Sequence, residues 1–110
     1  MSLDTAQKRL DEMLADLDRS ITVLQGEQPE AEPHTADAGA SLSDTERADA
    51  ALDAMGRQRA EVLAALERAR EGTYGKCADC GLQMTEGRLE ARPEASRCID
   101  CQAKRDRSRR

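Results

Sequence analysis

The stretch KCADCGLQMTEGRLEARPEASRCIDCQAK, residues 76–104, contains all four cysteines of this 110-residue chain. They form two CxxC pairs, Cys77 with Cys80 and Cys98 with Cys101, and residues 81–97 separate the pairs. A CxxC knuckle directs two sulfurs at a common point, and two knuckles together complete a tetrahedron around zinc. The stretch therefore predicts one structural Zn²⁺ ion held by four thiolates.

A redox role for one CxxC pair is the competing interpretation of these thiols. Thioredoxin-like motifs, however, lie in a βαβ context that this sequence lacks. Cytoplasmic thiols stay reduced, which favours metal binding over disulfides. Four thiolates also close the coordination sphere and leave no position for a water molecule, so zinc catalysis is not expected.

The rest of the chain offers little material for a buried core. It has no phenylalanine and no tryptophan, and Tyr74 is its only aromatic residue. A chain of this length forms one domain at most, and we expect a protein that is not an enzyme. No charged-then-apolar leader opens the sequence and no apolar run approaches the ~20 residues of a membrane span, so a cytoplasmic protein without membrane contact is expected.

Apolar residues before the cysteines recur at helical spacing in two runs. The first run is Leu3, Leu10, Leu14, Leu17, Ile21 and Leu24, and the second is Ala48, Leu52, Met55, Val62, Leu66 and Ala69, interrupted by Arg59. This heptad-like pattern predicts two helices packed along a narrow antiparallel seam. The second helix begins at the capping-box pattern of residues 43–46 or earlier, near Thr35, and ends at Gly72.

The register of the two helices follows from the same residues. In an antiparallel hairpin the numbers of facing residues have a constant sum, and a sum of 69 buries the most apolar surface. It sets Leu14 opposite Met55, leaves Leu10 opposite Arg59, and puts the apex near residues 34 and 35.

The predicted fold is mostly α, with a hairpin, a small head and a tail. Residues 1–71 form an antiparallel two-helix coiled-coil hairpin with a tip loop around residues 26–42, and residues 72–103 form a four-cysteine zinc finger. A short C-terminal helix and a basic tail, residues 104–110, complete the chain. We expect the few apolar side chains of the head to be buried, but they are too few to order it without metal: Leu82, Met84, Leu89 and Ile99.

Charge is distributed unevenly along the chain. Residues 1–71 hold 16 acids and 8 bases, whereas residues 72–110 hold 6 acids and 9 bases. The acidic hairpin is not expected to bind nucleic acid, because the phosphate backbone repels negative charge. Only the tail offers a basic cluster, so specific DNA binding is not expected, and a nucleic-acid-binding zinc ribbon stays an alternative.

The residues around the cysteines resemble a known family. GTYGKCADCG at 72–81, RLEARP at 88–93 and CIDCQ at 98–102 resemble the zinc finger of the DksA/TraR family of bacterial transcription regulators. The resemblance implies that the protein binds RNA polymerase, that the hairpin enters the secondary channel, and that the tip acts near the catalytic centre. The DxxDxA tip motif of the family falls on residues 34–39, where Asp37 matches the second aspartate and His34 replaces the first.

The resemblance also implies roles for basic residues. Arg88 and Arg92 are placed at the junction of head and rod, facing polymerase; alternatively they are surface partners of nearby glutamates. Members that respond to guanosine tetraphosphate carry basic residues on the coil and just after the last cysteine. This chain has Glu61 and Gln102 at those places and retains Arg92, so weak or absent synergy is expected.

A second hypothesis from a different class stands beside polymerase binding. A zinc-stabilised adaptor would pair with some other protein through its exposed coil. In either case a monomer is expected.

Overall fold

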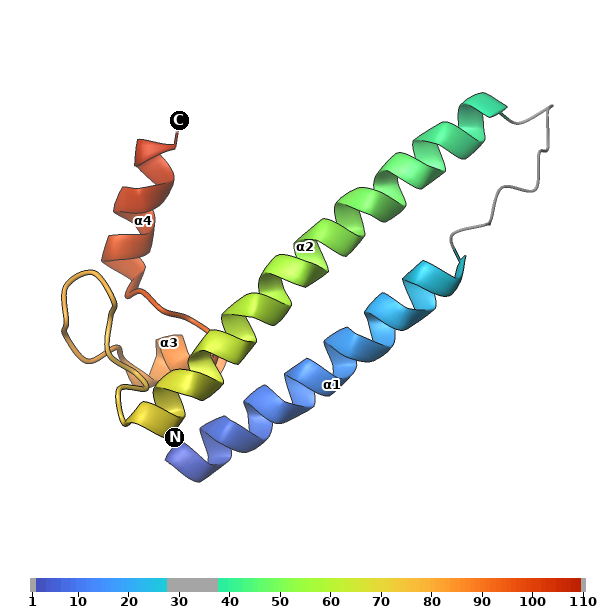
Figure 1. The fold of residues 1–110 in the computed structure, drawn as a ribbon. Coiled ribbons are helices and arrows are strands. Elements are labelled where there is room, and N and C mark those ends of the chain that lie inside the picture. The colour runs from blue at the N-terminus through green and yellow to red at the C-terminus, as the bar shows by residue number, and fades with distance from the viewer. Residues whose placement is uncertain (1, 28–37, 110) are drawn as a thin grey trace.

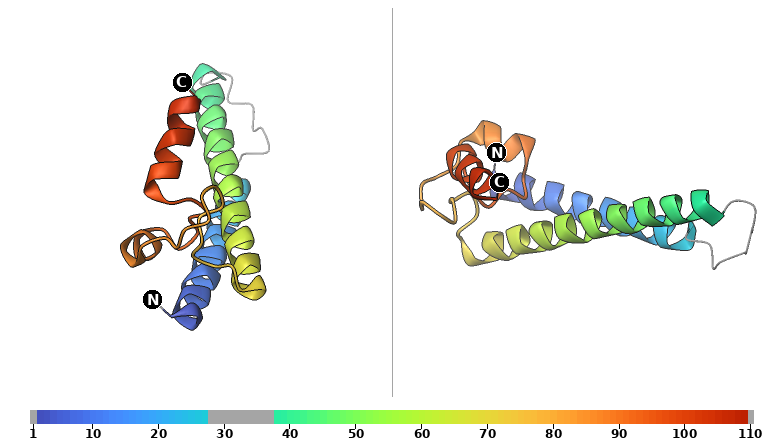
Figure 2. Two further views of the ribbon diagram at one scale, coloured as in Figure 1. Left: turned by 90° about the vertical axis from the view of Figure 1, so that its left-hand side faces the viewer. Right: turned by 90° about the horizontal axis from the view of Figure 1, so that it is seen from above.

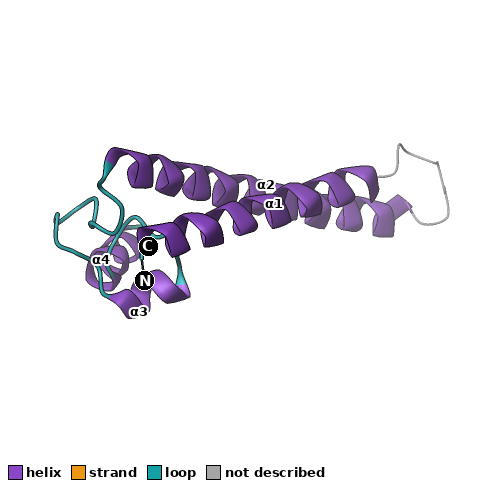
Figure 3. Ribbon diagram, turned by 90° about the horizontal axis from the view of Figure 1, so that it is seen from below, coloured by secondary structure: helices purple, strands orange, loops and turns teal. Residues whose placement is uncertain are grey.

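The computed structural model describes residues 2–27 and 38–109, and within them the side chains of residues 2–26 and 44–109. In these ranges lie four helices: α1 (Leu3–Glu27), α2 (Ala38–Glu71), α3 (Glu86–Ala91) and α4 (Ile99–Ser108). Helices α1 and α2 run antiparallel as a rod, and the described residues after α2 form a head beside the start of α1 and the end of α2 (Figures 1, 2 and 3). The radius of gyration is 17.9 Å, compared with ~13 Å for a compact globule of this length.

The two long helices begin in different ways. The Ser2 hydroxyl caps α1 by accepting a hydrogen bond from the backbone N–H of Thr5 at 3.2 Å. Helix α2 begins at Ala38, so the predicted start at residues 43–46 is wrong and the earlier start near Thr35 is closer. Alanine, the strongest helix former, recurs through residues 38–51, and the helix therefore continues across the capping pattern.

Helix α2 ends where the sequence predicts, at Gly72. The backbone N–H of Gly72 donates to the carbonyl of Ala69 at 3.4 Å, and that of Thr73 donates to the carbonyl of Arg68 at 2.9 Å. These two bonds form a Schellman motif, which needs a left-handed residue after the helix. Gly72 supplies it with φ of +82°, and the chain turns there from the rod into the head.

The core of the rod lies at the end nearest the head. Leu10 and Val62 are fully buried there, together with the small residues Ala6 and Ala65. Side chains packed around the cluster of Leu10, Val62 and Ala65 are Met13, Leu14, Leu17, Leu66 and Tyr74. Alanine at the contact lets the two helices approach closely, so the tightest packing of the rod lies next to the head.

The predicted register of the hairpin is wrong by roughly one helical turn or more. Leu10 packs against Val62 and Ala65 instead of facing Arg59. Arg59 instead reaches across the seam to Asp18, with 2.7 Å between Nε and Oδ1. The observed register is favourable because it avoids burying the charge of Arg59 against Leu10, and it gives the guanidinium a carboxylate partner instead.

Farther from the head the apolar contact becomes thinner. Met55, predicted opposite Leu14, instead lines a shallow hollow of about 280 Å³ with Val23 and Leu24, and Val23 is 58% exposed. Across residues 2–27 and 38–109, the helices are all too short or too polar to cross a membrane.

Shortening Leu10 should destabilise the rod strongly. Leu10→Ala leaves a cavity at a fully buried position, and we expect a loss of about 2–5 kcal/mol in the free energy of unfolding. Val23→Ala is the matched control, because that side chain is mostly exposed. Urea denaturation followed by circular dichroism measures both, and equal losses for the two variants would contradict the position of the core.

Candidate metal centre

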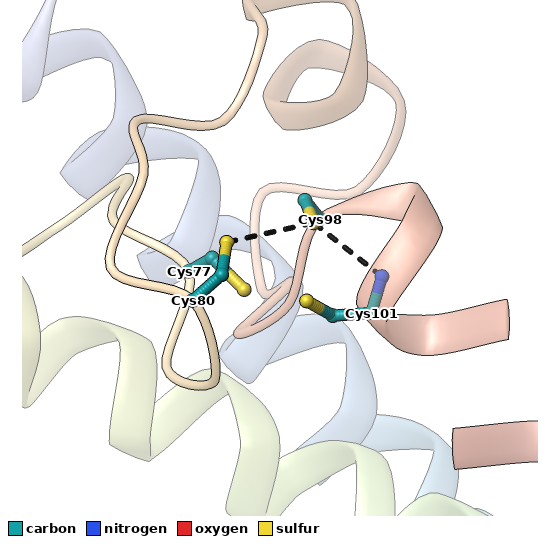
Figure 4. Close-up of side chains that lie close together, drawn as sticks. All are labelled: Cys77, Cys80, Cys98 and Cys101. Carbon is teal, nitrogen blue, oxygen red and sulfur yellow. Dashed lines mark hydrogen bonds between the residues drawn. The ribbon is translucent and has the colours of Figure 1, made fainter. Parts of the chain in front are cut away.

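The four cysteine sulfurs converge on one point at the base of α4. All four Sγ atoms lie within 4.8 Å of one another, and the Sγ atoms of Cys80 and Cys98 are 4.0 Å apart. A tetrahedral zinc site with Zn–S bonds of ~2.3 Å needs sulfurs ~3.8 Å apart. Figure 4 shows Cys77 and Cys80 on one loop, opposite Cys98 and Cys101 at the start of the helix. The arrangement fits a Zn²⁺ ion.

The first knuckle is a tight backbone turn. The N–H of Cys77 donates to the carbonyl of Leu82 at 2.8 Å, and the N–H of Gly81 donates to the carbonyl of Cys77 at 2.9 Å. Gly81 has φ of +76°, a conformation that glycine adopts without strain. Gly75, just before the knuckle, has φ of +89°, which also favours glycine.

The second knuckle coincides with the start of α4. Cys98 is the N-cap residue of this helix, and its sulfur accepts a hydrogen bond from the N–H of Cys101 at 3.4 Å. The N–H of Ala78, in the first knuckle, donates to the carbonyl of Ser96 at 2.7 Å. The two knuckles are therefore joined by backbone as well as by their sulfurs.

The electrostatics of the thiols also favour a cation. Backbone N–H groups of Cys80 and then Cys98 lower the pKa of Cys77 to about 6. Hydrogen bonding to the thiols of Cys98 and Cys77 raises the pKa of Cys101 to about 12. Four sulfurs this close ionise together only when a positive charge lies among them, and Zn²⁺ provides that charge.

The interior of the head is small. Its buried cluster is Cys77, Met84, Leu89 and Ala95, with Tyr74 packed against it. The prediction that Leu82 and Ile99 are buried is wrong, since they are 70% and 62% exposed. These two side chains lie at the surface, where they line a groove of about 350 Å³.

The predicted junction residues make contacts within the head. Arg88 Nε donates to the carbonyl of Arg97 at 3.2 Å, and Arg92 pairs with Glu94, with 3.5 Å between Nε and Oε1. Their contact with polymerase stays a prediction. The predicted tip residues, His34 and Asp37, lie outside the described residues.

Sequence reasoning missed the residues that join rod and head in the structure. Arg9 and Arg68, from α1 and α2, donate hydrogen bonds to backbone carbonyls of the head. The hydroxyl of Tyr74 does the same. The available signals were weak: Arg68 lies beside the seam residues Leu66 and Ala69 without belonging to the apolar pattern, and Tyr74 is the only aromatic residue.

The head matches a described family. Residues 72–107 match the model of the prokaryotic dksA/traR C4-type zinc finger. The chain carries a zinc finger of the dksA/traR family. The match to a C4-type zinc finger and the four convergent sulfurs together indicate one structural Zn²⁺ ion, with Cys77, Cys80, Cys98 and Cys101 as its ligands.

Similarity to known proteins extends beyond the dksA/traR finger. The RNA polymerase-binding transcription factor DksA of Caulobacter vibrioides is 36% identical over an alignment of 86 residues, which covers 76% of this chain and 60% of that protein. The protein of the same name from Escherichia coli K12 is 44% identical over 36 residues, 33% of this chain and 24% of that protein. This chain thus spans about three fifths of the length of the Caulobacter relative.

Two solved structures share the fold. Transcription factor DksA2 from Pseudomonas aeruginosa superposes with a TM-score of 0.82 at 24% identity, covering 98% of this chain and 86% of that one. The solution structure of DnaK suppressor protein from Agrobacterium tumefaciens C58 gives 0.63 at 23% identity, covering 94% of each chain. The predicted fold class, a helical hairpin followed by a four-cysteine head and a short helix, is confirmed.

Removing the metal should unfold the head selectively. Cys98→Ser deletes one zinc ligand while keeping a side chain that caps helices well, so loss of structure would reflect the metal and not the N-cap. We expect residues 76–102 to lose dispersed amide signals in NMR spectra, whereas α1 and α2 lose only part of their helicity. Ser96→Ala is the control, since it keeps the backbone carbonyl that bonds the first knuckle and loses only the hydroxyl that accepts a bond from Arg97 at 3.3 Å. A head that stays folded after chelation would contradict the prediction.

Proposed function

We propose that this chain is a bacterial transcription regulator that binds RNA polymerase. Its hairpin enters the secondary channel and the tip acts near the catalytic centre. The observation that carries the proposal is a dksA/traR finger at the base of an antiparallel hairpin. It is supported by 36% identity over 86 residues to a DksA that is named for binding RNA polymerase.

The shape and charge of the rod suit this role. The molecule measures 56 × 34 × 20 Å along its principal axes, and residues 1–71 carry twice as many acids as bases. Negative charge steers a rod into a positively lined channel. A carboxylate at its tip can then compete for Mg²⁺ or perturb basic catalytic loops.

A zinc-stabilised adaptor is the second candidate. The exposed side chains of Leu82 and Ile99 at the groove of the head favour a protein partner of some kind, because apolar patches of this sort mark protein contacts. Affinity purification of the full chain from bacterial lysate separates the two candidates. Polymerase subunits in stoichiometric amounts support the first, and their absence supports the adaptor.

The tip carboxylate should be needed for regulation but not for binding. Asp37→Asn removes one charge at nearly constant shape, and binding is spread over rod and head, so affinity should change less than about threefold. The effect on open-complex lifetime should be abolished or nearly so. Polymerase affinity and promoter-complex decay are measured for the wild type and the variant.

Asp53→Asn is the matched control, because it removes the same charge from an exposed position on α2. It should leave both quantities unchanged. If Asp37→Asn changed the open-complex lifetime as much as the wild type does, the tip carboxylate would have no role near the catalytic centre. That result would favour the adaptor candidate.

Synergy with guanosine tetraphosphate should be weak or absent. Glu61 is exposed on α2, and Gln102 on α4 is bonded to Asp106, with 3.0 Å between Nε2 and Oδ1. Neither supplies the positive charge that a polyphosphate needs. In transcription assays, the effect of the protein and the alarmone together should exceed the product of their separate effects by less than about twofold. A several-fold cooperative effect would refute the prediction.

A further inference from the structure

One segment of the head, residues 90–95, is held by donors that come from the rod. Nη2 of Arg9, on α1, donates to the carbonyl of Glu90 at 2.8 Å. Nη2 of Arg68, on α2, donates to the carbonyls of Glu94 at 3.5 Å and Ala95 at 3.3 Å. All three acceptors are main-chain oxygens, so these bonds fix the backbone of the head and not a mobile side chain.

Tyr74 adds a third point of attachment. Its hydroxyl donates to the carbonyl of Pro93 at 2.9 Å. Burial raises the pKa of Tyr74, so the hydroxyl stays protonated at neutral pH and remains a donor. The ring packs against both apolar clusters, that of the head and that of the rod. The only aromatic residue of the chain thus lies between its two parts.

Three donors from separate places converge on six consecutive residues. The donors lie on α1, on α2 and in the segment that follows α2. Attachment to several elements restricts rotation of the head, whereas a single point would allow it. The covalent link from rod to head passes through Gly72 and Gly75, both with positive φ, and such a link alone allows many orientations. The carbonyl bonds remove that freedom.

Arg68 does more than fill space. Its Nε is buried and has no hydrogen-bond partner within the described part of the chain, and burial lowers the pKa of its guanidinium. An apolar side chain of similar length would avoid both penalties. What the arginine adds is the pair of bonds to the carbonyls of the head.

We propose that Arg9, Arg68 and Tyr74 are positioning residues that lock the angle between the zinc head and the rod. The lock fixes where the tip lies when the head rests on its partner. This inference rests on the proposed function, in which head and rod engage polymerase together. When two binding parts are rigidly linked, the second binds at the high effective concentration set by the first.

Residual dipolar couplings of the zinc-loaded full chain test the lock directly. In the wild type, amides of residues 77–101 and of α1 and α2 should share one alignment tensor. In the double variant Arg68→Met, Tyr74→Phe, couplings in the head should shrink to about half or less of their wild-type size relative to the rod, while zinc content stays at one. A single shared tensor of unchanged size in the variant would overturn the inference.

Two further variants keep the comparison decisive. Arg70→Met is the matched control, since Arg70 is an exposed arginine on α2 that forms its ion pair with Glu67 of the same helix, with 3.5 Å between Nη1 and Oε2. It should retain one tensor. If the double variant lost zinc, Tyr74→Phe alone, which deletes one oxygen, would decide by the same measurement.

Polymerase binding tests the functional half of the inference. If about a tenth of the unlocked molecules hold the competent angle at any time, the dissociation constant for polymerase rises about tenfold. Arg68→Lys keeps a donor and the charge, so its affinity for polymerase should lie between those of the wild type and the unlocked variant. Unlocked variants that bind and regulate normally would overturn the positioning role. A wild type that shows one tensor but does not bind polymerase would instead refute the proposed function and leave the lock standing.

Discussion

The convergence of four thiols on one point is the constraint on which the rest of the head depends. The apolar side chains buried there are few, with Met84 and Leu89 the largest, and so small an interior does not offset the conformational entropy of some thirty ordered residues. Metal–thiolate bonds supply the missing stability. Tetrahedral zinc also requires its four sulfurs at a fixed separation. The tight glycine turns and backbone hydrogen bonds of the knuckles hold the cysteines at that separation.

The zinc centre and the rod are connected through the same few residues. Cys77 belongs to the apolar cluster that contains Ala95, and the carbonyl of Ala95 accepts a bond from Arg68 of the rod. Metal binding therefore orders the acceptors that the rod uses. Loss of zinc would free not only the knuckles but also the carbonyls at residues 90–95, so under the proposed lock the angle between the two parts depends on the metal.

The sequence predicted what local rules determine and missed what depends on tertiary placement. Paired cysteines predicted the metal site because ligand geometry is encoded in CxxC spacing, and apolar periodicity predicted both long helices. The register was wrong because the apolar pattern left out Ala6 and Ala65, which are fully buried where the helices meet. Leu82 and Ile99 were assigned to the interior because they are apolar, a rule that holds in one direction only. Bonds from Arg9 and Arg68 to distant carbonyls leave no periodic signal.

Stability and proposed chemistry lie at opposite ends of this molecule. The fully buried side chains of the rod, Leu10 and Val62, lie beside the head. Farther from the head, the contact between the helices consists of partly exposed residues and the Asp18–Arg59 ion pair. An exposed ion pair of this kind contributes little to the free energy of folding. A rod built this way is stiffest where it is attached. A side chain at the far end then needs no folded pocket of its own, because its position is set by the angle at the base and by the length of two helices. Under the proposed function, the tip can therefore vary in sequence while the base keeps its carbonyl bonds and its four thiolates.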